Sequence, residues 1–202
     1  MMKYLKDPAY QKELIRKSIH ISLGIVCSVL ISYRILKPFH LFILLVLIIF
    51  LSFQHKRKPL PLLRSILERC DRPDHFPAKG LITYFIGMLL SIQLFPLPYA
   101  LASIMILALG DGTAALARPW SKRKSKLSNK HLVEESLTGI VFGTLGASMF
   151  ISFPQAIIAA SCAMILEAVE VRFNNEILDD NILTPLAAGT SLLLLAKFGL
   201  FT

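Results

Sequence analysis

The chain has 202 residues, of which 54% are hydrophobic and 17% charged, and its mean hydropathy of +0.61 is too high for a soluble domain. A disordered, collagen-like or disulfide-framework protein is also excluded, because aliphatic residues dominate and there are only 10 glycines, 11 prolines and 3 cysteines. The net charge of +9 is explained by Lys and Arg gathering on the cytoplasmic side of membrane helices. Composition therefore predicts an integral membrane protein and no nucleic-acid partner.

Seven apolar stretches between the charge clusters are long enough to predict spanning helices, which need roughly 17 to 25 residues. In chain order they are 19–35, 38–54, 80–96, 98–117, 136–153, 155–171 and 182–201, and the second is among the shortest. Four prolines fall at junctions, where a fixed φ and a missing N–H suit a helix start: Pro38, Pro96, Pro98 and Pro154. The sequence thus predicts an all-α, polytopic protein whose residues 1–202 form a single transmembrane domain.

The charged residues predict how the spans are oriented. With seven spans, nineteen Lys and Arg residues fall on the side of the N-terminus and three on the other side: Arg34, Lys37 and Lys197. This bias places the N-terminus in the cytoplasm. All 13 acidic residues fall on the same side, and the outer connections 95–99 and 152–155 are short and uncharged. We expect the active site to face the cytoplasm, in a prokaryotic plasma membrane or a eukaryotic ER or plastid membrane.

Polar residues form five clusters where the predicted spans meet the cytoplasm, and ionisable groups at such positions need a partner or a function. The first cluster holds Arg16, Lys17 and His20, with Arg16 and His20 four residues apart on one helix face. A basic membrane anchor explains the two cations but not His20. In the second cluster, Lys79 and Gly80 begin the third span, where a cation and helix N-terminal amides suit phosphate, with ordinary capping as the alternative.

The third cluster lies inside the fourth span, where Asp111 follows twelve uncharged residues. Asp111 and Arg118 are seven residues apart on one helix face, so that a carboxylate and a guanidinium could meet one polyanion or its metal. A structural Asp–Arg pair is the alternative. Gly110 would let a ligand or another helix approach closely.

The fourth cluster, residues 129–136, leads into the fifth span and contains Lys130, Glu134 and Ser136. A Glu134 side chain facing Asp111 would form a magnesium pair, since Mg²⁺ takes one or two carboxylates together with substrate phosphates and water. Acidic residues at a helix start also have an ordinary capping role, which is the alternative here.

The fifth cluster joins the end of the sixth span to the start of the seventh. Glu167 and Glu170 are three residues apart on one helix, and Asp179 or Asp180 is expected to cap the next. Asn181 enters the apolar span, which a cap does not require. The five clusters together place carboxylates, cations and small residues on one membrane face.

The order of these motifs resembles that of the CTP-dependent lipid-alcohol kinases, the family of dolichol kinase, phytol kinase and the CTP-dependent diacylglycerol kinase. The resemblance covers nearly the whole chain and rests on Arg16-Lys17 with His20, Lys79-Gly80, Gly110-Asp111 with Ala114 and Arg118, Glu134 with Ser136, and Asp180-Asn181 with Pro185. It implies transfer of the γ-phosphate of CTP, with Mg²⁺ or another divalent cation, to a polyprenol, phytol or diacylglycerol. The sequence has no P-loop and no protein-kinase signature set.

The resemblance and the chemistry together predict Asp111 and Glu134 as catalytic and metal-binding residues. Binding of the nucleotide and its phosphates is expected from twelve residues: Arg16, Lys17, His20, Lys79, Gly80, Gly110, Thr113, Arg118, Lys130, Ser136, Asp180 and Asn181. The implied partners are a nucleoside triphosphate, a membrane lipid alcohol and the bilayer. Two alternatives remain open: a related lipid cytidylyltransferase, which releases pyrophosphate and leaves CMP on the lipid, and a non-enzymatic transporter.

Overall fold

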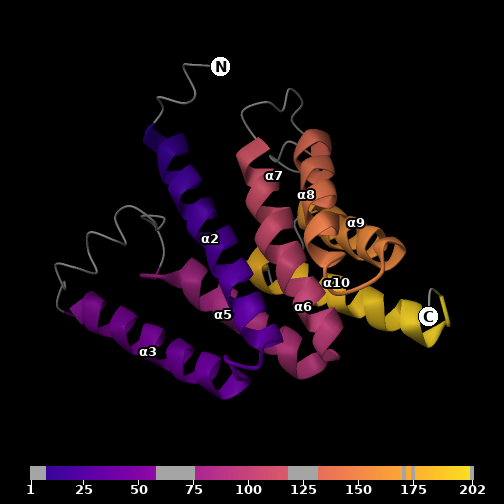
Figure 1. Ribbon diagram of the computed structural model, residues 1–202. Helices are drawn as coiled ribbons and strands as arrows, with labels where there is room; N and C mark the ends of the chain where they lie inside the picture. The colour runs from indigo at the N-terminus through magenta and orange to yellow at the C-terminus, as the bar shows by residue number, and fades with distance from the viewer. Residues whose placement is uncertain (1–7, 58–75, 118–131, 170–171, 174–175, 201–202) are drawn as a thin grey trace.

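A computed structural model of the chain describes residues 8–57, 76–117, 132–169, 172–173 and 176–200. Within these residues a helix forms over each of the seven predicted apolar stretches (Figure 1). In chain order they are α2 (Pro8–Ser32), α3 (Pro38–Arg57), α5 (Lys79–Leu94), a helix composed of α6 (Leu97–Met105), η1 (Ile106–Asp111) and α7 (Gly112–Ala117), then α8 (Leu132–Ala147), α9 (Phe153–Val169) and α10 (Asp180–Lys197).

Three of the described helices are long and apolar enough to cross a membrane: Tyr10–Ser32, Pro38–Arg57 and Leu97–Ala117. The second predicted stretch, which was among the shortest, forms a 20-residue helix, longer than the 16 residues of α5. It continues through His55, Lys56 and Arg57, because basic residues suit the carbonyl end of a helix. The described part of the chain is thus an α-helical protein with three membrane-length helices.

Proline and aspartate begin helices where the sequence predicted. All four predicted prolines lie at helix starts. Pro38 is the first residue of α3, Pro96 directly precedes α6, Pro98 lies in the first turn of α6, and Pro154 is the second residue of α9. Asp179 is the N-cap of α10, because its side chain accepts a hydrogen bond from the Asn181 amide at 3.1 Å. This identifies Asp179 as the cap.

A short hairpin interrupts the otherwise α-helical fold. Strand β1 (Arg172–Phe173) pairs antiparallel with β2 (Glu176–Ile177), with Phe173 opposite Glu176. The pair lies between α9 and α10, where no apolar stretch is long enough for a helix. Phe173 and Ile177 are residue types that favour extended backbone.

The helix that carries Asp111 is central, and α3 is peripheral. In the most apolar part of the Leu97–Ala117 helix 78% of the residues are buried, compared with 17% in that of α3. Helix α3 packs on α5 at one edge of the bundle (Figure 1). Helix η1 packs against α2, α8 and α10, and α9 packs between α8 and α10. The buried cluster between α9 and α10 is rich in alanines, which allow close helix contact: Ala156, Ala159, Ala160, Ala163 and Ala188.

Candidate functional site

A buried ion pair joins α2, at a residue just before the first predicted span, to the helix of the fourth predicted span. Lys17 Nζ on α2 lies 2.6 Å from Asp111 Oδ2 on η1, and the two side chains are only 8% and 7% exposed. Asp111 is the last residue of a π-helical segment, a wide turn that often occurs at functional sites. The prediction that Asp111 lies inside the helix, where its burial requires a partner, is therefore confirmed, and that partner is Lys17.

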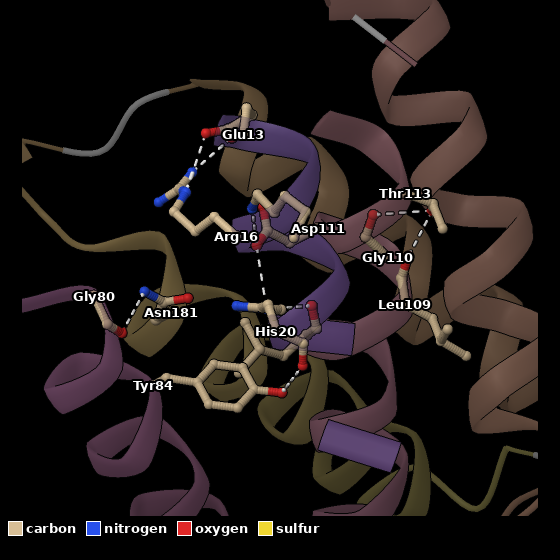
Figure 2. A network of polar contacts seen from close by, with 12 residues as sticks. Glu13, Arg16, His20, Gly80, Tyr84, Leu109, Gly110, Asp111, Thr113 and Asn181 are labelled. Atoms are coloured by element: carbon tan, nitrogen blue, oxygen red, sulfur yellow. Dashed lines mark hydrogen bonds and ion pairs between the residues drawn. The ribbon is translucent and has the colours of Figure 1, made fainter. Parts of the chain in front are cut away.

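His20 is held beside this pair by two acceptors. Its Nε2 atom lies 3.4 Å from Asp111 Oδ2 and 3.3 Å from the carbonyl oxygen of Leu107 (Figure 2). A carbonyl and an ionised carboxylate can only accept, so this geometry assigns the proton to Nε2. The contacts from Lys17 and His20 both fall on Oδ2 of Asp111.

Tyr84 on α5 supports His20 from the other side. Its hydroxyl donates to the His20 carbonyl oxygen at 3.1 Å, and the two rings lie with their centroids 4.1 Å apart (Figure 2). Tyr84 is 1% exposed. Tyr84 was not among the residues predicted from the sequence, although a tyrosine in an apolar stretch is a recognisable signal, because its buried hydroxyl needs a hydrogen-bond partner.

Arg16 lies at a more exposed position, one residue before Lys17. Its guanidinium makes a two-point contact with Glu13, at 2.6 Å and 3.1 Å. The carboxylates of Asp111 and Asp179 also interact with it electrostatically. Arg16 is therefore close to the buried pair while it remains 27% exposed. Glu13 was not predicted, though its i,i+3 spacing from Arg16 is a recognisable signal.

The start of α10 is bound to the start of α5. The side-chain amide of Asn181 donates to the carbonyl of Gly80 at 3.3 Å and to Thr83 Oγ1 at 3.1 Å. A side chain at Gly87 would collide with the Asn181 backbone, so the glycine permits this close approach. Because Thr83 precedes Tyr84, the first two turns of α5 connect Asn181 to the His20 contact.

Two predicted phosphate-binding residues make contacts within the helical framework. A Cβ atom on Gly110 would lie 3.3 Å from the Gly139 carbonyl and 3.2 Å from Met164 Cε, so Gly110 serves helix packing between η1, α8 and α9. The Thr113 hydroxyl donates to the carbonyl of Leu109 at 2.5 Å on its own helix. The close approach of other helices at Gly110 is one of the two alternatives expected from the sequence, whereas the Thr113 contact was not expected.

The remaining predicted residues lie at helix starts or outside the described residues. Lys79 and Asp180 are the first residues of α5 and α10, and Glu134 and Ser136 lie near the start of α8. Arg118 and Lys130 lie outside the described residues. The pairing of Glu134 with Asp111 around a metal therefore stays a prediction, as does a contact of Arg118 with the same ligand.

No group of three or more His, Cys, Asp or Glu side chains within the described ranges could hold a metal ion. The predicted site does not require one, because substrate phosphates and water complete the shell of a magnesium ion that has one or two carboxylate ligands.

Comparisons with protein families, curated proteins and solved structures found no match to this chain. The fold and the site define its class without a relative: an α-helical protein with three membrane-length helices and a buried charged cluster where α2, α5 and η1 meet.

Proposed function

We propose that this protein transfers the γ-phosphate of CTP to a membrane lipid alcohol. The observation that carries the proposal is the buried Lys17–Asp111 pair with His20 beside it. A buried ion pair is not in general more stabilising than apolar residues of the same volume, so its presence in a membrane-length helix points to function. The order of the sequence motifs supports a lipid-alcohol kinase and is the basis for choosing CTP.

The cations of α2 suit the phosphates of a nucleotide. Arg16 offers a planar guanidinium near the buried pair, and Lys17 offers a point charge at 2.6 Å from Asp111. A phosphate oxygen that replaced the Asp111 contact of Lys17 would leave that ammonium paired and free Asp111 for another ligand. Arg16 and Lys17 would together neutralise the charge that spreads over the transferred phosphoryl group.

Asp111 and Glu134 are the residues that would hold the divalent cation. When bound, Mg²⁺ supplies charge neutralisation on the phosphates. The fit rests on Oδ1 of Asp111, which is the oxygen not used by Lys17 and His20.

In the proposed reaction the alcohol oxygen forms a bond to the γ-phosphorus while the bond from that phosphorus to the β-phosphate oxygen breaks. CDP leaves with the bonding electron pair, and a carboxylate of the site accepts the alcohol proton. The products are a lipid phosphate and CDP. The acceptor is a polyprenol, phytol or diacylglycerol that reaches the site from the bilayer.

The proposal includes all seven helices as membrane spans, with the N-terminus and the site on the cytoplasmic side. The distribution of basic residues supports this orientation. The helices α5, α8 and α9, with 16 or 17 residues, would cross where the hydrocarbon layer is thin or where neighbouring helices cover their ends.

The test is a transfer assay on the full-length protein in detergent, with Mg²⁺ and CTP labelled at either the γ- or the α-phosphate. A panel of diacylglycerol, phytol, geranylgeraniol and polyprenol serves as acceptor, and label is followed into extractable lipid. We expect label from the γ position only. Label from the α position would instead establish a cytidylyltransferase, and no transfer from CTP or ATP would overturn the kinase proposal in favour of transport.

A further inference from the structure

We propose that Tyr84 is a positioning residue of the site, which acts by fixing His20 in front of Asp111. The inference rests on the proposed function, since it concerns the geometry of the same reaction. It starts from an unusual contact: the Tyr84 hydroxyl donates across 64 positions of sequence to a backbone carbonyl of α2, at residue 20.

Gly24 makes that contact possible. In an α-helix the carbonyl of residue 20 accepts the amide of residue 24, so Gly24 lies directly over the carbonyl that Tyr84 reaches. A Cβ atom at Gly24 would collide with the Tyr84 hydroxyl and with Ala108 Cβ. The absence of a side chain at Gly24 therefore lets α5 and η1 both pack against the same turn of α2, the turn that follows His20.

The imidazole of His20 is held on two sides. The Tyr84 ring packs against it at 4.1 Å between centroids, and its Nε2 atom contacts the Leu107 carbonyl and Asp111. Tyr84 therefore acts on Asp111 only by way of His20: its ring packs on the imidazole, and its hydroxyl binds the backbone carbonyl of the same residue. Loss of the hydroxyl would free α2 to slide against α5, which would alter where His20 meets Asp111.

Packing alone does not explain the hydroxyl. The ring fills a buried position that phenylalanine would fill equally well, and a buried hydroxyl is unfavourable unless it is hydrogen-bonded. The carbonyl that it contacts already has a helical amide partner, so the hydroxyl is not needed to satisfy it. What the bond adds is a fixed position of α5 relative to His20.

The experiment compares Tyr84→Phe with Tyr99→Phe in the γ-labelled CTP assay on the full-length protein. Tyr99 lies at the start of α6, twelve residues before Asp111 and about 18 Å along the helix, so the control makes the same chemical change away from the site. For Tyr84→Phe we expect kcat to fall roughly 10-fold or more, because small misplacements of catalytic groups are costly. We expect the KM for CTP and the Tm to stay at wild-type values. Tyr99→Phe should leave all three unchanged.

A second arm tests whether Tyr84 acts through His20. In the His20→Gln background there is no imidazole to position, so adding Tyr84→Phe should cause no further loss of kcat. If kcat of the double variant falls by the product of the two single-variant losses, the inference is overturned. A Tyr84→Phe variant with wild-type kcat would also overturn it, as would one whose loss of kcat accompanies a lowered Tm. All of these comparisons of kcat require a wild-type protein that transfers the γ-phosphate. If the wild type transfers none, the proposed function falls, and this inference falls with it.

Discussion

Replacing Lys17 by methionine tests how tightly the buried pair is coupled to folding. Methionine keeps the length and apolar stem of lysine and removes the charge, which leaves Asp111 in a position where its side chain is 7% exposed. Breaking one partner of a buried ion pair destabilises proteins by about 3–5 kcal/mol, because the remaining charge is unpaired. His20 is the only other described side chain within ion-pair range of that carboxylate, at 3.4 Å, and we expect it to compensate only in part.

The assay is reversible unfolding in mixed detergent micelles of increasing SDS fraction, followed by circular dichroism of the helices. Lys17→Met should lose about 3–5 kcal/mol of unfolding free energy, whereas the double variant Lys17→Met/Asp111→Leu should recover most of it, since apolar replacement of a whole pair is often neutral or stabilising. The matched control is Lys37→Met, because Lys37 is exposed at the connection before α3 and should change stability little.

Two results would refute this reasoning. If Lys17→Met lies within about 0.5 kcal/mol of the wild type, as exposed ion pairs do, the pair is not isolated from water. If the double variant loses as much as both single variants together, the two side chains are not energetically coupled.

Three further predictions concern turnover, packing and capping. Asp111→Asn should abolish phosphoryl transfer while the protein remains helical and membrane-inserted, and wild-type activity would contradict the assignment. Gly139→Ala should lower unfolding free energy by about 1–3 kcal/mol through overpacking, because its Cβ would collide with Met164 and lie 3.0 Å from the Gly110 carbonyl; Gly80→Ala, with no atom within 4 Å, should be neutral or slightly stabilising in the same titration. Asp179→Ala should lose about 0.5–2 kcal/mol with the N-cap, and Asp179→Asn, which can still accept the amide, should lose less.

The positions of the helices follow from the sequence because each depends on local features. Apolar stretches between charge clusters and the prolines at their edges mark the helices. The sequence limited the cap of α10 to Asp179 or Asp180, and the structure identifies Asp179. The burial of Asp111 was also predictable, since twelve uncharged residues precede it in one apolar stretch.

The partners within the site were not predictable in the same way. Periodicity shows which residues share a helix face, but not which helix that face meets, so the sequence grouped Lys17 with its neighbours on α2 rather than with Asp111, 94 positions away. The same limit applies to Tyr84, whose partner is a backbone carbonyl and leaves no trace in residue type. The π-helical turn of η1 has no compositional signature, because its residues would also suit an α-helix.

That turn has an evolutionary consequence. A turn that closes after five residues rather than four accommodates one additional residue without breaking the helix on either side. A relative that lacked one residue between Ile106 and Asp111 would form a regular α-helix there, and its carboxylate would still face α2, because fewer residues at the larger α-helical step cover nearly the same angle. A one-residue gap in an alignment of homologues is therefore expected within this segment and not elsewhere in the helix, where it would turn the carboxylate away from α2 by about 100°.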